Sequence, residues 1–185
     1  VKDWDTYNDT AKKMKDAGVP IDGIGMQGHY NIYGPSMEDV DAAITKYSTI
    51  VKNIHFTELD IRTTSEMGGQ VQFSRGEQKE VPQYIKTLQE AQYSNLFRVL
   101  RKHRDVIKNV TFWNLSDRDS WLGTYNYALP FDVNYKPKNV YYLIKNFKPE
   151  LDNAVAKEDF QPSVSNQPGQ QYPMVNSQGY ARFRV

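Results

Sequence analysis

Apolar and polar positions follow two periods along the chain, one typical of helices and one typical of strands. In the first segment, Tyr7, Ala11 and Met14 recur at helical spacing, and Gly18 followed by Pro20 marks a stop. Short apolar runs without that spacing indicate strands. The pattern predicts helices over residues 4–17, 36–51, 82–104 and 139–147, and strands over residues 21–29, 54–61 and 110–114.

The alternation of these helices and strands predicts parallel strands joined by helical crossovers, which places the chain in the α/β class. Three short strands cannot close a barrel, and a sheet of three with open edges would expose backbone and apolar surface. A complete (β/α)8 barrel needs about 250 residues, whereas this chain has 185. We therefore expect residues 1–150 to be part of a larger fold.

The composition changes after residue 150. Residues 151–171 are rich in Gln, Asn, Ser and Pro, which is typical of a linker. Near the end of the chain, Tyr180, Arg182 and Arg184 alternate with smaller or apolar residues, which indicates a strand. The sequence thus predicts a linker over residues 151–171 and the start of a further β-sandwich module over residues 172–185, with an ordinary tail as the alternative.

The charge is nearly balanced, with 23 basic and 22 acidic residues, which disfavours a polyanionic partner such as nucleic acid. No stretch reaches the roughly 18 apolar residues of a membrane span, and the polar first residues do not form a signal peptide. The chain does not begin with Met, so we expect it to start inside a longer protein.

Metal and redox chemistry find little support in the sequence. Cysteine is absent, which excludes disulfides and thiolate metal sites. The three histidines, at positions 29, 55 and 103, lack ligand spacing, and His103 ends a basic helix face that we interpret as solvated. We expect neither a bound metal nor a cofactor.

Two carboxylates on the second strand are the main candidates for chemistry. Residues i and i+2 share one face of a strand, so Glu58 and Asp60 point together, whereas Thr57 and Leu59 point towards the covering helices. His29 on the preceding strand can pair with Asp60. Buried carboxylates are costly unless partnered, and active sites of α/β barrels lie at the C-terminal ends of strands. A buried polar network without chemistry is the alternative.

Aromatic residues are abundant, with 13 Tyr, 8 Phe and 3 Trp. Core packing is the simpler interpretation of that composition, although flat rings also stack on the faces of sugars. Trp113 ends the third predicted strand, and Trp121 lies in the loop that follows. Because both belong to the same rim as the carboxylates, their positions favour sugar stacking.

Four motifs carry a resemblance to a known family. They are IDGIGMQGH at residues 21–29, FTELDI at 56–61, VTFWNLSD at 110–117 with SW at 120–121, and LPFD at 129–132 with KPK at 136–138. In this order and spacing they resemble the family 10 glycoside hydrolases, mainly endo-β-1,4-xylanases, over about residues 5–150. The resemblance implies the C-terminal part of a (β/α)8 TIM barrel, namely its sixth to eighth strands with their helices, completed by an absent N-terminal half.

The resemblance also implies catalytic roles. Glu58 matches the family's nucleophile, His29 matches the histidine that hydrogen-bonds it, and Asp60 matches the carboxylate that holds that histidine. An ionised carboxylate is needed for attack, and a hydrogen bond to the charged form favours that form.

Substrate contacts follow from the same motifs. Gln27 matches a glutamine that lines the cleavage site, and Trp113 and Trp121 match the tryptophans that wall the sugar site. The sequence departs from the family at Asn114, where Gly is usual, and has Arg118 at a position that varies. Both differences concern the sites for the leaving group or for substrate decorations.

A retaining glycosidase uses two carboxyl groups about 5–5.5 Å apart, one as nucleophile and one as acid/base. The family's acid/base glutamate lies at the end of the fourth strand in a Trp-Asp-Val-Val-Asn-Glu-like segment, which this sequence lacks. We therefore expect a retaining endo-β-1,4-xylanase that hydrolyses internal bonds of xylan, and a chain that is inactive alone. Its expected partners are xylan or xylo-oligosaccharides and the N-terminal half of the barrel, as a separate chain or in the parent protein.

Four other interpretations concern function and context. A non-catalytic glycan-binding barrel fragment is the alternative, although a pure binder needs no nucleophile. A non-glycosidase barrel such as an aldolase lacks a strand lysine and a phosphate-binding glycine loop to support it. The tail also resembles the opening of the module that precedes feruloyl esterase-type domains. A polymeric substrate implies secretion, or a periplasmic or cell-surface location.

Overall fold

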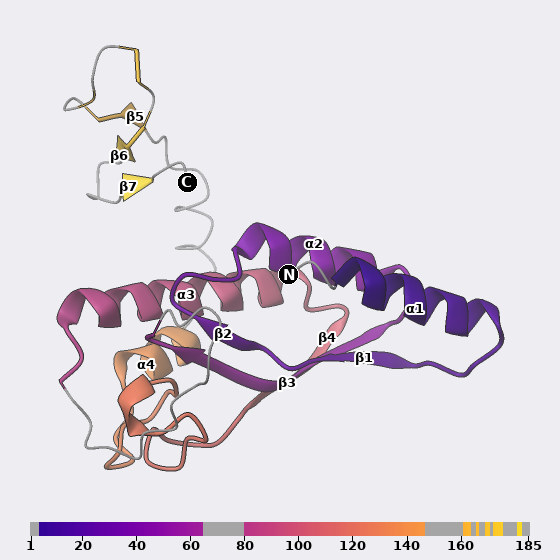
Figure 1. Ribbon diagram of the computed structural model, residues 1–185, viewed down its shortest axis with the longest axis horizontal. Coiled ribbons are helices and arrows are strands. Elements are labelled where there is room, and N and C mark those ends of the chain that lie inside the picture. Colours follow the sequence, from indigo (N-terminus) through magenta and orange to yellow (C-terminus); the bar gives the residue numbers. More distant parts are fainter. Residues whose placement is uncertain are drawn as a thin grey trace. The chain divides into compact units, whose positions relative to one another are not determined.

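The structure, a computed structural model, describes residues 4–64, 80–146, 161–163, 166, 169–170, 172–175 and 181–182. The chain forms two compact units, Val1–Asn146 and Phe147–Val185. The described part of the larger unit contains α1 (Trp4–Asp16), β1 (Gly23–Met26), β2 (His29–Asn31), α2 (Met37–Ser48), β3 (Asn53–Arg62), α3 (Gln83–Lys102), β4 (Ile107–Phe112), the short 3₁₀ helix η1 (Thr124–Asn126) and α4 (Asn139–Lys145) (Figure 1).

The strands of the larger unit form a parallel sheet with β3 at its centre. β1 and β2 pair successively with one side of β3, and β4 pairs with the other side (Figure 1). The predicted alternation of helices with parallel strands is therefore confirmed. The first predicted strand, over residues 21–29, is in fact two strands, because Gly28 interrupts it with a φ of +84°.

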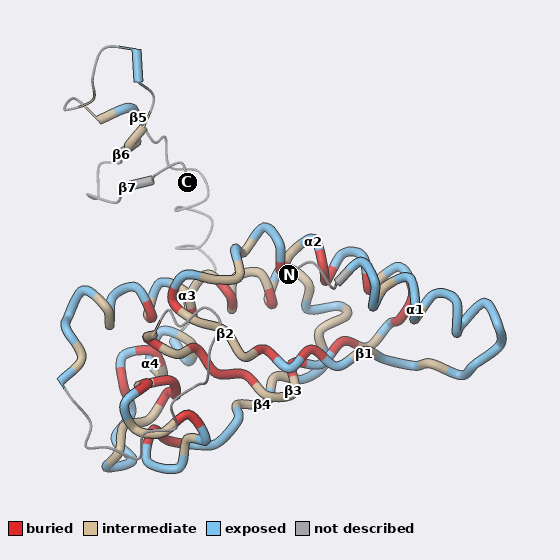
Figure 2. Tube along the Cα trace, viewed as in Figure 1, coloured by how far each residue is buried: buried red, intermediate tan, exposed pale blue. Residues whose placement is uncertain are grey.

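The hydrophobic core lies between β3 and the helices α2 and α3. Figure 2 shows buried segments along β3 and on the helices above it. The core residues are Val40, Ala43, Ile44 and Tyr47 of α2, Ile54, Phe56, Leu59 and Ile61 of β3, and Tyr93, Leu96 and Leu100 of α3, with others packed around them. Helix α2 begins where predicted, since the Ser36 side chain accepts a hydrogen bond from the Asp39 backbone amide at 3.1 Å.

A β-bulge interrupts β3 beside its two carboxylates. On the β1/β2 side, residues 27–28 lie opposite residues 57–59, and on the β4 side, residue 111 lies opposite residues 57–58. β3 therefore holds one residue more than either neighbour at this point. Such a bulge shifts the alternation of side chains between the two faces of a strand.

The bulge corrects one prediction about side-chain direction. Phe56 and Leu59 are both fully buried in the core, although they lie three residues apart. Thr57, which was predicted to point towards the helices, lies on the opposite face instead. A Cβ placed on Gly25 would meet the Thr57 methyl at 3.2 Å, and Gly25 pairs with His55, which is exposed. The prediction for Leu59 is confirmed and that for Thr57 is wrong.

Two further details differ from the sequence pattern. β4 begins earlier than predicted and ends at Phe112, so Trp113 follows the strand. His103 is not on a solvated face, because its side chain is only 15% exposed and its Nε2 atom lies 2.5 Å from Asp41 Oδ1. The segment between the second predicted strand and the third predicted helix lies mostly outside the described residues.

The smaller unit contains a three-stranded antiparallel sheet of β5 (Gln161–Pro162), β6 (Met174–Val175) and β7 (Ala181–Arg182). β5 lies within the range predicted as a linker. The assignment of residues 172–185 to the start of a β-sandwich module stays a prediction. Among the helices that the structure describes, none has the length and apolar character needed to cross a membrane.

Candidate active site

Three side chains from two adjacent strands form a hydrogen-bonded chain at the C-terminal end of the sheet. His29 of β2 lies opposite Asp60 of β3 in the strand register. The His29 Nδ1 atom lies 2.9 Å from Asp60 Oδ2, and its Nε2 atom lies 3.1 Å from Glu58 Oε2. The structure therefore brings together the three residues predicted to form the catalytic group.

The three residues differ in their access to solvent. The Asp60 side chain is 1% exposed, whereas those of His29 and Glu58 are 22% and 26% exposed. Burial raises the pKa of Asp60, and the hydrogen bond from Trp121 together with the charge and hydrogen bond of His29 opposes that rise. A buried carboxyl thus lies behind the histidine, and a partly open carboxylate lies in front of it.

The geometry fixes the direction of the hydrogen bonds in this group. Ionised carboxylates can only accept hydrogen bonds, so the imidazole of His29 donates from both ring nitrogens when Glu58 and Asp60 are both ionised. Asp60 then fixes the orientation of the ring, as a carboxylate beside a functional histidine commonly does. One oxygen of Glu58 is held by His29, and the Glu58 side chain remains partly exposed to solvent.

Trp121 is a further member of this group. Its indole Nε1 donates to Asp60 Oδ2 at 2.8 Å, and its ring centre lies 4.9 Å from that of His29. Its role as a sugar-stacking surface was predicted, but its hydrogen bond to Asp60 was not. The bond joins residues 61 positions apart, and no local spacing in the sequence indicates it.

The bulge in β3 sets the position of Glu58. The Glu58 backbone amide donates to the Gln27 carbonyl at 2.8 Å, and the Asp60 amide donates to the Gly28 carbonyl at 3.2 Å. The Thr57 hydroxyl donates to the Met26 carbonyl at 3.3 Å. The interruption between β1 and β2 and the bulge in β3 therefore meet at the nucleophile candidate.

The remaining predicted substrate contacts lie at the same end of the sheet. Gln27 is exposed and lies between β1 and β2, directly before Gly28. Trp113 and Trp121 are 42% and 39% exposed, and the Trp113 amide donates to the Leu59 carbonyl at 3.0 Å. Both indoles thus present exposed surface at this end of the sheet.

Asn114 and Arg118, the two departures from the resembled family, have clear local settings. Asn114 has a φ of +89°, a conformation that favours Gly and that Asn tolerates better than other residues. Its side-chain nitrogen is placed to donate to the carbonyls of Trp113, at 2.8 Å, and Asp119, at 3.3 Å. The Arg118 guanidinium lies 5.8 Å from the ring centre of Tyr135.

No group of three or more His, Cys, Asp or Glu side chains in the described residues is arranged to hold a metal ion. The groups that the structure brings together at the candidate site are two carboxyl groups, an imidazole and two partly exposed indoles. This set of groups can perform nucleophilic attack and can stack on sugars.

Comparison with known proteins identifies the family of this chain. The model of glycosyl hydrolase family 10 matches residues 2–147. The chain belongs to this family, and the predicted resemblance is confirmed. Its α/β sheet is accordingly a fragment of the family's (β/α)8 barrel.

Individual relatives agree. The chain is 64% identical over 179 residues to an endo-1,4-beta-xylanase/feruloyl esterase of Xylanibacter ruminicola, in an alignment that covers 97% of this chain and 24% of that protein. It is 34% identical to endo-1,4-beta-xylanase B of Paenibacillus barcinonensis over 78% of this chain and 43% of that protein. The chain thus spans less than half the length of these two curated relatives.

A solved structure gives the same result. A psychrophilic glycoside hydrolase family 10 endo-beta-1,4-xylanase superposes with a TM-score of 0.71 and 58% identity, over 78% of this chain and 42% of that one. Because the match covers less than half of that structure, the larger unit corresponds to part of the other protein's fold.

Proposed function

We propose that this chain is the nucleophile-bearing part of a retaining endo-β-1,4-xylanase, with Glu58 as the nucleophile. The observation that carries the proposal is the chain of contacts from Glu58 to His29 to Asp60, at 3.1 Å and 2.9 Å. It places an accessible carboxylate at the C-terminal ends of parallel strands, where active sites of barrel enzymes lie. The xylanase names of the relatives support xylan as the substrate.

In this proposal the sheet of the larger unit comprises the sixth to eighth strands of the barrel. β1 and β2 together form the sixth strand, β3 forms the seventh and β4 forms the eighth. The first five strands belong to an N-terminal half that is not in this chain. That half also supplies the acid/base glutamate, so the isolated chain does not hydrolyse xylan.

The proposed mechanism assigns one step to each group. Glu58 attacks the anomeric carbon and forms a glycosyl ester, while the acid/base carboxyl of the other half protonates the departing oxygen. Water, deprotonated by that same carboxyl, then cleaves the ester and frees Glu58. His29 orients Glu58 in the first step and Asp60 keeps the imidazole in place. Trp113 and Trp121 stack on the sugar, and Gln27 lines the cleavage site.

The wider setting is part of the proposal. A polymeric substrate requires an enzyme that is secreted, periplasmic or at the cell surface. The alignment to the xylanase/feruloyl esterase extends over 97% of this chain, so it includes most of the smaller unit. This coverage supports residues 172–185 as the start of a module that precedes an esterase-type domain.

A covalent label tests the function directly. A complete barrel containing this chain is incubated with a 2-fluoro xyloside bearing a good leaving group, which traps the glycosyl ester. Peptide mass spectrometry is expected to find the label on Glu58. The Glu58→Ala variant is expected to lose at least about 10⁴-fold in kcat, and added azide is expected to restore cleavage with a product of inverted configuration.

The same experiment separates the enzyme from a glycan-binding fragment. A binding module would retain xylo-oligosaccharides without acquiring the label, and Glu58→Ala would leave its behaviour unchanged. Labelling at a different carboxylate would refute the assignment of Glu58.

A further inference from the structure

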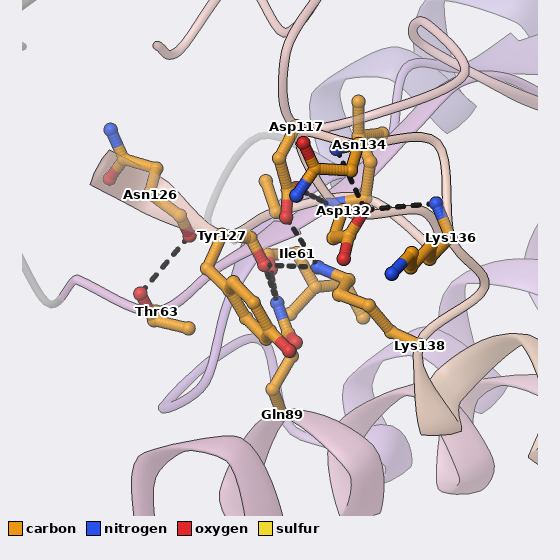
Figure 3. Close-up of polar contacts among 12 residues, drawn as sticks. Ile61, Thr63, Gln89, Asp117, Asn126, Tyr127, Asp132, Asn134, Lys136 and Lys138 are labelled. Carbon is orange, nitrogen blue, oxygen red and sulfur yellow. Dashed lines mark hydrogen bonds and ion pairs between the residues drawn. The ribbon is translucent and has the colours of Figure 1, made fainter. Parts of the chain in front are cut away.

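A buried ion pair lies behind the candidate site and takes no part in the proposed chemistry. Lys138 Nζ lies 2.9 Å from Asp117 Oδ2, and the side chains are 5% and 0% exposed (Figure 3). Lys138 Nζ also donates to the Tyr127 carbonyl at 3.0 Å and lies 3.5 Å from the centre of the Tyr127 ring. The second oxygen of Asp117 accepts a hydrogen bond from the Leu129 amide at 2.9 Å. Every polar atom of the pair thus has a partner.

The pair ties together the start, middle and end of one long loop, residues 113–138. Asp117 is near its start, Tyr127 and Leu129 are in its second half, and Lys138 is at its end, where α4 begins. Backbone bonds reinforce the closure, since Asp117 N donates to Phe131 O and Lys138 N donates to Pro130 O, both at 2.9 Å. Figure 3 shows Asp117 and Tyr127 beside the Lys138 side chain.

The closed loop is also attached to β3 next to Asp60. Gln89 of α3 is fully buried, and its amide nitrogen donates to the Ile61 carbonyl at 2.7 Å and to the Tyr127 carbonyl at 2.5 Å (Figure 3). The Ile61 amide in turn donates to the Ala128 carbonyl at 3.3 Å. The loop therefore runs along the C-terminal end of β3, next to Asp60.

The same loop carries Trp121. Its indole nitrogen holds Asp60 Oδ2 at 2.8 Å, and Asp60 holds His29. The position of Trp121 depends on the path of the loop, and that path is closed by the Asp117–Lys138 pair. The loop backbone between Asp117 and Trp121, followed by the contacts of Trp121 with Asp60 and of Asp60 with His29, therefore connects the ion pair to the residue that touches Glu58.

The ion pair is poorly suited to a purely stabilising role. Burial lowers the pKa of Lys138 to about 8 and raises the pKa of Asp117, so desolvation outweighs the attraction between the two charges. Replacing such a pair by uncharged groups of similar size is often neutral or stabilising. A different benefit is needed to explain two fully buried charges at this place.

We propose that Asp117 and Lys138 are positioning residues that act through Trp121 on Asp60 and His29, and so set the reactivity of Glu58. This inference rests on the proposed function, because it presumes that Glu58 is the nucleophile. It predicts that the pair can be removed with little loss of stability and a large loss of catalytic rate. A merely structural pair would behave in the opposite way.

The test uses the complete barrel with the double variant Asp117→Asn/Lys138→Met. The new amide keeps an oxygen for the Leu129 N–H, and the new thioether side chain fills the volume of the lysine without a charge. The thermal midpoint is expected to equal or exceed that of the wild type. The rate of labelling by the 2-fluoro xyloside, counted per labelled site, is expected to fall by roughly ten- to a hundredfold. Should the double variant not fold, Lys138→Gln keeps a donor to both acceptors and is expected to give a smaller fall in the same rate.

A double-mutant cycle with Trp121→Phe tests whether the ion pair acts through Trp121. This substitution removes the N–H that holds Asp60, and with it the contact through which the pair is proposed to act. In that background, Asp117→Asn/Lys138→Met is expected to change the labelling rate by less than about twofold. Lys102→Met, which removes one charge from the exposed Asp41 cluster between α2 and α3, is the matched control and is expected to leave the rate unchanged.

The outcomes separate this inference from the proposed function. A wild-type labelling rate in the double variant, or a full additive loss in the Trp121→Phe background, would overturn the positioning role and leave the proposed function standing. A lower thermal midpoint with an unchanged rate per labelled site would assign the pair a structural role and also overturn it. Absence of label on Glu58 in the wild type would overturn the proposed function and this inference together.

Discussion

At the scale of single residues, the candidate site is a series of groups with decreasing exposure. Glu58 is partly open, His29 lies behind it, and Asp60 is buried and held by Trp121 as well as by His29. Each group holds the side chain in front of it through a hydrogen bond. The charge of Asp60 is costly to bury, so its loss should affect function more than packing.

The Asp60→Asn substitution tests this dependence in a complete barrel. The amide keeps the shape of the side chain, but it lacks the negative charge that accepts the hydrogen bond from His29 Nδ1 and holds the ring in place. We expect kcat to fall by roughly 10²- to 10⁴-fold, as for other histidines that lose a carboxylate partner, with a small change in KM. Steady-state kinetics on xylo-oligosaccharides measures both. Asp105→Asn, on the exposed turn before β4, is the control; equal kinetics of Asp60→Asn and wild type would contradict the role of Asp60.

Much of this site could be predicted from the sequence, and the part that could not has a physical reason. The i and i+2 relation between Glu58 and Asp60 follows from strand geometry, and the pairing with His29 follows from parallel strands. The predicted direction of the Thr57 side chain was wrong because the bulge breaks the alternation of side chains between the two faces of β3. The pattern itself carries the signal, since the buried apolar positions are 54, 56, 59 and 61, with a gap of three between the middle two.

At the scale of elements, the alternation of helices and strands was predictable because the helices bury apolar residues at helical spacing and the central strand β3 buries Ile54, Phe56, Leu59 and Ile61. The ends were less predictable. β4 ends before Trp113, and Gly28 divides the first strand, because hydrogen bonds to neighbouring strands, rather than apolar periodicity, decide where a strand stops. The network around Lys138 depends on contacts between distant segments and has no local signature.

The link between α2 and α3 gives a prediction that depends on pH. The hydrogen bond from Lys102 lowers the pKa of Asp41, and His103 adds to this effect. A carboxyl with a lowered folded-state pKa contributes stability above its unfolded value near 3.8, and this contribution is lost as the pH falls through the folded-state value. Because Asp41 is partly exposed, the contribution is small, about 0.2–1 kcal/mol.

We therefore expect Asp41→Asn to lower the free energy of unfolding of the complete protein at neutral pH and to match the wild type under acid conditions. Urea denaturation at a series of pH values measures the difference. Lys102→Met is expected to show the same convergence, because it removes the other half of the pair. A difference between wild type and Asp41→Asn that grows as the pH falls would contradict this account.

At the scale of the whole molecule, the sheet of the larger unit has two outer sides. Among the described strands, β1, β2 and β4 each pair only with β3. Alternation along the outer strands leaves Gly25, Asn109 and Thr111 exposed on the sheet. In a closed barrel these positions face other strands or the barrel interior, which agrees with a chain that spans less than half of its relatives.

The last prediction concerns the two halves of the proposed barrel. In the proposed function the acid/base carboxyl belongs to the other half, so this chain alone is expected to release no reducing sugar from xylan and to label slowly or not at all. Co-expression with a segment carrying the first five strands of the same parent protein should complete the sheet and bring the second carboxyl to Glu58. Xylanase activity and labelling of Glu58 should then appear together.

The complementation needs a control for activity that comes from the added half. The same co-expression with Glu58→Ala in this chain should assemble to the same extent, measured by co-purification, yet remain inactive on xylan. Activity of the isolated chain would contradict the prediction, because one carboxyl cannot both attack the anomeric carbon and protonate the leaving oxygen. Activity of the assembled Glu58→Ala pair would show that the nucleophile lies elsewhere, since the barrel would then be complete and only this carboxylate would be missing.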